Sequence, residues 1–320
     1  MVVMTAPVPV HVPVLLNETL RFLNVREGGA YIDCTTGLGG HSSAIAERMG
    51  ESGRLLCLDQ DSEALEFARA RLAPFGRRVS FVHANFREVA AVAAREGFHD
   101  VDGILMDLGI SSFQIGEARR GFAFGLEGPL DMRMDPASGG VTAGEIVNTW
   151  DETSLANLFF ELGEERQSHR IARAIVANRP LRTTWDLARS VEQAVGGTRR
   201  QTHIHPATKV FLALRLRVNG ELDTLITALP LALGLLDAGK PHFGRLAVIA
   251  FHSLEDRIVK QFFRRESTDC LCPPELPECR CGHRASLREL TRKAVLPTEA
   301  EVAANPRARS AVLRVAERIV

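Results

Sequence analysis

Acidic and glycine residues follow short apolar runs near the start of the chain, a pattern typical of a ligand site at a sheet edge. Gly37, Gly39 and Gly40 form a glycine-rich turn after the run that ends in Asp33. A strand, a glycine turn and a helix in this order present backbone N–H groups to a ligand. The spacing differs from the G-x-G-x-x-G of dinucleotide folds, which makes room for pyrophosphate. The turn therefore favours a cofactor without phosphates, although such turns also serve as plain connections between a strand and a helix.

Two further carboxylates and an aromatic residue follow the next apolar runs. Asp59 ends the second run, where a carboxylate can accept both hydroxyls of a ribose, whereas helix capping suits Asp61 better. Phe86 could stack on an adenine, although a lone aromatic residue is more often part of the core. Asp107 ends the fourth run. Together these features fit S-adenosylmethionine, which combines adenine, ribose and an amino acid, better than NAD.

The elements that must position these residues are predicted from periodicity. Buried strands alternating with helices predict an α/β fold with a doubly wound, mostly parallel sheet. We expect strands at 30–34, 54–58, 79–82, 103–106 and 244–251, and a terminal antiparallel pair at 286–294 and 310–317. We expect helices at 41–49, 62–72 (capped by Ser62), 153–162, 168–177, 184–195, 207–218, 222–235 and 253–263. Residues 1–110 and 237–320 would form the sheet domain, and 111–236 a loop and helical insertion.

Charge is unevenly distributed, although 39 basic and 39 acidic side chains balance overall. Residues 1–165 carry 13 basic and 24 acidic side chains (13 − 24 = −11), and residues 166–217 carry 11 and 2 (11 − 2 = +9). This favours an RNA-docking surface on the insertion, although solvated arginine-rich helix faces would give the same count. The basic residues are Arg166, Arg170, Arg173, Arg179, Arg182, Arg189, Arg199, Arg200, Lys209, Arg215 and Arg217.

Seven long blocks of the sequence match one known family. They are HVPVLLNE at 11–18, GLGGHS at 37–42, MDLGISSFQ at 106–114, RGFAF at 120–124, GPLDMRMD at 128–135, HPATKVFLALRLRVNGEL at 205–222 and AFHSLEDRIVK at 250–260. Through these blocks the chain resembles the RsmH (MraW) family of ribosomal RNA methyltransferases, from about residue 11 to the last strand.

The resemblance implies a class I S-adenosylmethionine-dependent methyltransferase fold and S-adenosylmethionine as the methyl donor. It implies 16S rRNA of the assembled small ribosomal subunit as substrate, methylated at the exocyclic N4 of a cytidine in the decoding region. The cofactor site that it implies comprises Gly39, Gly40, His41, Asp59, Phe86, Asp107 and Gln114.

A cytosine amine is a poor nucleophile, because its lone pair is delocalised into the ring. Positioning lowers the barrier, and an acceptor for the amine protons favours the charge that develops on nitrogen. Asp107 is the candidate catalytic residue, and it could serve the cofactor, the amine or both. Asp131 and His252 are alternatives, although a buried side chain satisfied by backbone is the more ordinary role of each.

The six cysteines fall into two groups. Cys34 and Cys57 lie in predicted strands and are expected in the core. The other four form C-x-C, six residues, C-x-C, and their thiolates could bind a structural zinc ion on a tight hairpin. The spacing is not that of the usual C-x₂-C knuckle, so a plain surface hairpin is the alternative. The four are Cys270, Cys272, Cys279 and Cys281.

Composition excludes several other classes. No apolar run approaches the ~18 residues needed to span a bilayer, and the first residues make a poor signal peptide. We therefore expect a cytoplasmic protein with reduced thiols and no membrane partner. Two alternatives to a methyltransferase are a Rossmann dehydrogenase, disfavoured by the glycine spacing, and a ribosome-assembly factor that binds RNA without catalysis.

Overall fold

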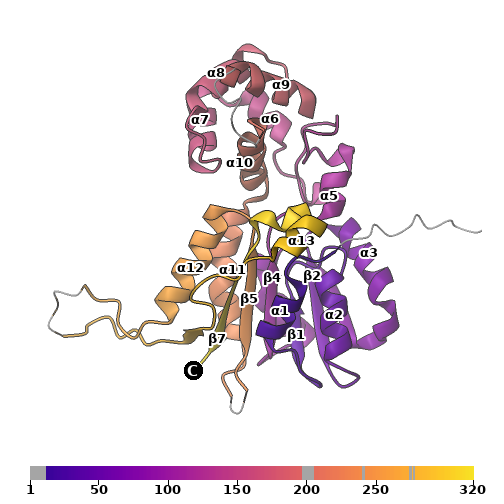
Figure 1. Cartoon of the computed structure of the whole chain (residues 1–320), viewed down its shortest axis with the longest axis vertical. Helices are drawn as coiled ribbons and strands as arrows, with labels where there is room; N and C mark the ends of the chain where they lie inside the picture. The colour runs from indigo at the N-terminus through magenta and orange to yellow at the C-terminus, as the bar shows by residue number, and fades with distance from the viewer. Residues whose placement is uncertain (1–11, 197–204, 240–241, 274–275, 277) are drawn as a thin grey trace, which may run out of the picture. The chain divides into compact units, whose positions relative to one another are not determined.

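The computed structural model describes residues 12–196, 205–239, 242–273, 276 and 278–320. The chain divides into two compact units (Figure 1): Met1–Gly109 with Asp223–Val320, and Ile110–Leu222. Within the described residues, no helix has both the length and the apolar character needed to cross a membrane.

The first unit contains a seven-stranded sheet with the order β3-β2-β1-β4-β5-β7-β6. Strands β1 to β5 run parallel, and β7 lies antiparallel between β5 and β6. The strands are β1 (Ala30–Asp33), β2 (Arg54–Asp59), β3 (Val79–His83), β4 (Gly103–Asp107), β5 (Arg245–Ala250), β6 (Leu287–Glu289) and β7 (Val312–Arg318). The predicted doubly wound, mostly parallel sheet is confirmed, as is the terminal antiparallel pair.

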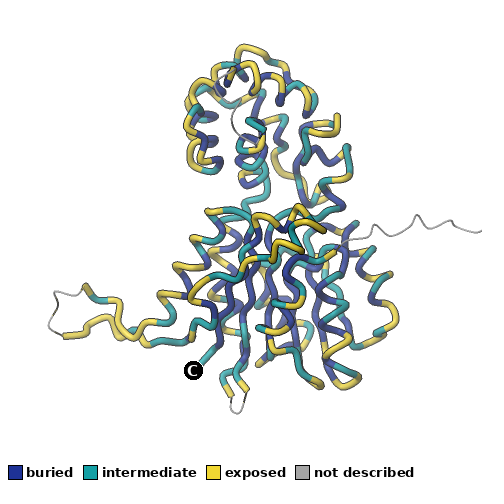
Figure 2. The backbone as a smooth tube through the Cα atoms, in the orientation of Figure 1, coloured by how far each residue is buried: buried dark blue, intermediate teal, exposed yellow. Residues whose placement is uncertain are grey.

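Helices cover both faces of this sheet, because successive strand residues point to opposite sides. One core contains Ile32 and Ile104 together with side chains of α4, α11 and α12. The core on the opposite face contains their neighbours Tyr31 and Leu105 together with side chains of α1, α2 and α3. In Figure 2 the strands are mostly buried along their length. The helices are α1 (Leu16–Leu23), α2 (Gly40–Arg48), α3 (Ser62–Leu72), α4 (Val89–Glu96), α11 (Glu221–Leu235), α12 (Ser253–Glu266) and α13 (Glu299–Ala304).

The strand order reverses beside β1, which pairs with β2 on one side and β4 on the other. The chain proceeds outward from β1 through β2 to β3, and then returns to β4 and proceeds the other way to β5. Ligands of doubly wound sheets bind beyond the carboxyl ends of the strands at such a reversal. Asp33, Asp59 and Asp107 each end a strand at this edge.

The second unit has its own apolar core, which includes Val147, Phe159 and Leu214. Its described residues form helices and loops and no strand of the sheet. Its helices are α5 (Ser112–Gly116), α6 (Ala143–Thr149), α7 (Glu152–Glu161), α8 (Ser168–Ala177), α9 (Thr184–Val195) and α10 (Ala207–Asn219). The unit ends at Leu222 rather than at 236, because Leu225 and Leu229 of α11 pack in the core of the sheet unit.

Candidate active site

The Asp59 carboxylate fixes the glycine turn of the neighbouring strand. Its Oδ2 accepts the backbone N–H of Gly37 at 2.7 Å, and its Oδ1 accepts that of Asp61 at 2.8 Å. Burial raises the pKa of Asp59 to about 7, and these two N–H donors oppose the rise. Asp61, rather than Ser62, caps α3, because its carboxylate accepts two N–H groups of the first turn. Asp59 thus holds the glycine turn and is only partly buried, whereas Asp61 is buried and caps the helix.

The turn itself depends on glycine. Gly37 and Gly39 have φ angles of 52° and 78°, in the left-handed region that side chains disfavour. A Cβ on Gly39 would also lie 3.3 Å from Cα and Cβ of Ala68. The turn therefore packs closely against α3 and leads directly into α2, whose first residues are Gly40 and His41.

Asp33 is buried at the end of β1 and is held by short polar neighbours. Ser42 donates its hydroxyl to Asp33 Oδ2 at 2.6 Å, and the Thr35 backbone N–H lies 3.1 Å from Oδ1. Burial raises the pKa of this carboxyl, and the Ser42 hydrogen bond opposes the rise. The sequence pattern does not single out Ser42, whose only signal is its place three residues after Gly39 of the turn.

Asp107 ends β4 beside this cluster. Its backbone N–H donates to Thr35 Oγ1 at 2.6 Å, and its Oδ2 lies 3.5 Å from His41 Nε2. Asp107 Oδ1 is buried and has no hydrogen-bond partner within the part of the chain that the structure describes. Burial alone would lower the pKa of His41, but the carboxylates of Asp107 and Asp33 outweigh it and raise that pKa. His41 Nε2 therefore faces one Asp107 oxygen, Oδ2, and Oδ1 is the oxygen left for a donor.

The two remaining predicted cofactor residues differ in their surroundings. Phe86 begins a short 3₁₀ segment after β3 and is partly buried against the core of the sheet unit. Gln114 belongs to the second unit, where its buried side chain accepts the Ser111 backbone N–H in a capping box at the start of α5.

His252, an alternative acceptor, sits at the N-terminus of α12. Its Nε2 lies 3.0 Å from Glu255 Oε1, and Glu255 also accepts the backbone N–H of Phe251 at 2.9 Å. Glu255 is buried, and its backbone N–H donates to His252 Nδ1 at 3.5 Å, so His252 caps its own helix, which is an ordinary structural role. Its Nε2 has no hydrogen-bond partner among the described residues.

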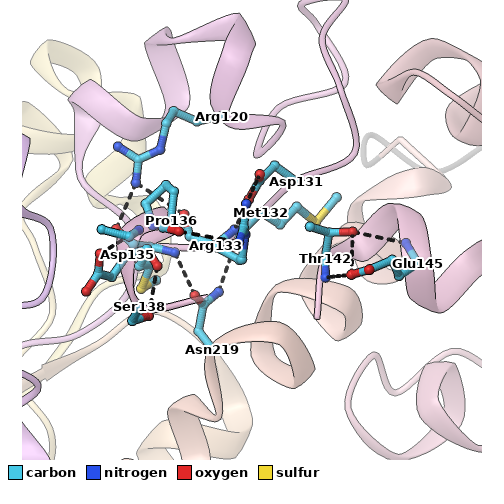
Figure 3. A network of polar contacts seen from close by, with 12 residues as sticks. Arg120, Asp131, Met132, Arg133, Asp135, Pro136, Ser138, Thr142, Glu145 and Asn219 are labelled. Atoms are coloured by element: carbon cyan, nitrogen blue, oxygen red, sulfur yellow. Dashed lines mark hydrogen bonds and ion pairs between the residues drawn. The ribbon is translucent and has the colours of Figure 1, made fainter. Parts of the chain in front are cut away.

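Asp131, the other alternative, is engaged by Arg133 in the second unit. The Arg133 guanidinium donates to both carboxylate oxygens, at 2.9 and 2.8 Å. Burial raises the pKa of Asp131, but the Arg133 hydrogen bonds outweigh it and lower that pKa. Figure 3 shows Arg120 and Asn219 holding the same segment through backbone atoms of residues 132–134. This network ties down a loop and leaves little of the carboxylate for a substrate.

The basic residues of the insertion separate into two sets. Arg215 forms an ion pair with Glu221, Arg179 donates to backbone carbonyls, and Lys209 donates to the Glu164 carbonyl. Arg199 and Arg200 lie outside the described residues. Six basic residues of the set are exposed, namely Arg166, Arg170, Arg173, Arg182, Arg189 and Arg217.

The cysteines divide as predicted: Cys34 and Cys57 are buried strand and strand-end residues, and all six are free thiols. The Sγ atoms of the other four lie within 4.8 Å of one another, on the loop between α12 and β6. The sheet unit thus contains two clusters of predicted site residues. One is the acidic edge at the strand ends, and the other is the group of four thiols on this loop.

Comparison with known proteins gives consistent results. A model of the MraW methylase family matches residues 9–319. The Ribosomal RNA small subunit methyltransferase H of Thermomicrobium roseum is 54% identical over 312 residues, covering 97% of this chain and 94% of the relative. Its namesake from Syntrophotalea carbinolica is 50% identical over 319 residues, covering 99% and 100%. A solved rRNA methylase from Streptococcus thermophilus covers 97% of this chain and 99% of its own, at 10% identity and a TM-score of 0.43, which is a weak likeness.

Proposed function

We propose that this chain, which belongs to the MraW methylase family, transfers a methyl group from S-adenosylmethionine to 16S rRNA in the small ribosomal subunit. The acceptor that we propose is the exocyclic N4 of a cytidine in the decoding region. Both relatives described above are named ribosomal RNA small subunit methyltransferase H, and this name supports a small-subunit rRNA substrate. The sheet has the strand order of the class I methyltransferase fold.

The residues at the carboxyl edge of the sheet fit S-adenosylmethionine. The Gly39 turn lets a ligand approach the backbone closely, and the Asp59 carboxylate has lone pairs beyond its two N–H partners for ribose hydroxyls. The partly buried Phe86 would stack on the adenine. Gly40 and His41 begin the helix that follows the turn. Gln114, which belongs to the second unit, is kept in the proposed set on the family resemblance alone.

The observation that most favours an amine acceptor is the buried Asp107 Oδ1, which has no hydrogen-bond partner within the described part of the chain. S-adenosylmethionine, when bound, supplies an electrophilic methyl group on a sulfonium centre. Asp107 Oδ1 would accept one N–H of the cytosine amine, orient its lone pair, and take the proton that the nitrogen releases. His41 would hold the opposite carboxylate oxygen, and Thr35 would hold the Asp107 backbone. Most of the rate enhancement would come from positioning.

The second unit is the proposed RNA-docking part, supported by its exposed arginines. Arginine contacts with phosphates supply most of the affinity for RNA. The target base would have to leave its stack to reach the methyl donor. A dehydrogenase, the first alternative from the sequence, is wrong, because the family is a methylase family.

Transfer of a labelled methyl group tests this function against the alternative of RNA binding without catalysis. Small subunits from a strain that lacks the endogenous enzyme would be incubated with the chain and methyl-labelled S-adenosylmethionine. Nuclease digestion and mass spectrometry should then locate label in N4-methylcytidine at one decoding-region position. Label at another atom or another position would overturn the specific proposal. Binding of subunits without any transfer would favour the assembly-factor alternative.

A further inference from the structure

The loop between α12 and β6, residues 267–286, here called the cysteine hairpin, gathers four thiols away from the acidic edge of the sheet. Cys281 Sγ lies 3.7 Å from Cys279 Sγ and 3.9 Å from Cys270 Sγ, and all four sulfurs lie within 4.8 Å of one another. Disulfide-bonded sulfurs would be about 2.05 Å apart. The cluster is therefore one of free thiols that converge on a common centre.

The separations of 3.7 and 3.9 Å are close to those in a tetrahedral metal site. Zinc–sulfur bonds of about 2.3 Å in tetrahedral geometry place the sulfurs about 3.8 Å apart. Residues two apart on an extended chain point to the same side, so a C-x-C pair can direct both sulfurs at one ion. Two such pairs face each other here, one on each arm of the hairpin.

Backbone hydrogen bonds to sulfur connect the two arms. The Leu271 N–H on the first arm donates to Cys281 Sγ on the second at 3.3 Å. The Arg280 N–H on the second arm donates to Cys272 Sγ on the first, also at 3.3 Å. Such donors favour the thiolate, which is the form that binds metal. The arrangement is reciprocal, because the middle residue of each C-x-C pair donates its backbone N–H to a cysteine sulfur of the other pair.

The described residues of the hairpin form no apolar core that would hold these arms together. Among the described residues of 269–282, none is buried, and Leu271 and Leu276 are 44% and 43% exposed. Figure 2 shows this exposure along the extension at the left of the view. The base is anchored, because Ser286 N–H donates to the Glu266 carbonyl at 2.8 Å and His283 Nδ1 lies 2.8 Å from the Thr268 carbonyl. Beyond this base, burial contributes almost nothing to order.

We propose that the cysteine hairpin binds one Zn²⁺ ion and that this ion, rather than a hydrophobic core, fixes its fold. Four protein thiolates fill the tetrahedral shell and leave no position for a substrate or a reactive water, so the site is structural. Zinc is preferred to a calcium- or magnesium-type ion because the donors are all sulfur. The ligands are Cys270, Cys272, Cys279 and Cys281.

Metal analysis of the full chain tests this site without reference to methyl transfer. The untagged protein would be produced in zinc-supplemented medium under reducing conditions, freed of loose ions, and analysed by inductively coupled plasma mass spectrometry. We expect about one zinc ion per chain, released when a mercurial reagent modifies the thiols. Replacement with Co²⁺ should give the intense absorption bands of a tetrahedral thiolate site.

Two variants separate a ligand role from a folding effect. Cys279→Ser with Cys281→Ser should lose the zinc but keep the unfolding transition of the sheet, because none of the described side chains of the hairpin is buried. Leu271→Ala, in the same hairpin, should keep the zinc. The proposal is overturned if the purified chain holds less than about a tenth of an equivalent of zinc, or if the double variant keeps the metal. It is also overturned if the intact mass shows disulfides, or if another metal fills the site.

Discussion

His41 Nε2 lies 3.5 Å from Asp107 Oδ2, joining the first turn of α2 to the end of β4. This contact positions the Asp107 carboxylate at the end of the strand through only one of its two oxygens. The histidine faces one oxygen, and Thr35 holds the backbone. Oδ1 is buried and has no hydrogen-bond partner among the residues that the structure describes.

Replacing Asp107 by Asn should separate binding from chemistry. The amide keeps one acceptor oxygen but loses the charge, so cofactor affinity should fall modestly. The single-turnover rate of methyl transfer at saturating cofactor should fall about 10² to 10³-fold, as is typical when one transition-state interaction is removed. Rapid-quench transfer to small subunits, beside calorimetric affinity, measures both. A saturated rate within a few-fold of wild type would assign Asp107 to cofactor binding alone.

A matched control lies at the other end of the same strand. Asp102 precedes β4, pairs with Arg26 and accepts the Ala30 N–H. Asp102→Asn makes the same chemical change far from the acidic edge. It should lower stability without lowering the single-turnover rate.

Cofactor affinity should depend on the ionisation of Asp59. Asp59 titrates near 4 in the unfolded chain and at about 7 in the ligand-free fold. Between these values the fold holds more protons, so the free energy of unfolding should fall as pH rises. Ribose hydroxyls would stabilise the charged form, so affinity should rise as the pH passes through about 7.

Calorimetry at pH values on either side of this pKa would compare wild type with Asp59→Asn. The cofactor itself also titrates, but this contribution to the affinity is the same for both proteins. It therefore cancels when the two affinities are compared at each pH. The variant should bind more weakly and lose the part of the pH dependence that Asp59 supplies. An unchanged pH dependence in the variant would remove the Asp59 carboxylate from the site.

The exposed arginines of the insertion should determine salt-dependent docking. Arg182→Gln with Arg189→Gln should weaken small-subunit binding and reduce the slope of log affinity against log salt by about 0.7–0.9 for each phosphate that is no longer neutralised. Arg48→Gln with Arg77→Gln changes the charge equally on the sheet unit, where both side chains are also exposed. Equal slopes for the two double variants would show that total charge, and not this surface, governs docking.

Removing zinc should expose the cysteine hairpin to proteolysis. Arg280 and Arg284 are both exposed trypsin sites, and with no buried side chains the demetallated hairpin should open readily. Brief digestion with and without chelator, followed by mass spectrometry, should show chelator-dependent cleavage after these residues. Equal cleavage in both samples would mean that the ion does not order the hairpin.

Much of the sheet and its acidic edge was predictable, because buried parallel strands leave continuous apolar runs and Asp33, Asp59 and Asp107 directly follow three of them. The roles of Thr35 and Ser42 were not predictable from the sequence, because threonine and serine near strand ends have many different roles. The helix 222–235 was predicted but placed in the wrong unit. Its apolar residues show that it is buried, yet nothing local says whether Leu225 meets the sheet or the helical core.

The pairing of β4 with β5 has a consequence for biosynthesis. Gly103 pairs with Arg245 and Asp107 with Ile249, although the whole second unit lies between these strands in the sequence. During synthesis, β1 to β4 emerge first, and one edge of β4 has no neighbour until the helical unit has been translated. The helical unit, with a core of its own, can fold during this interval. The strand end that carries Asp107 therefore gains its neighbour, β5, only after the helical unit has been translated.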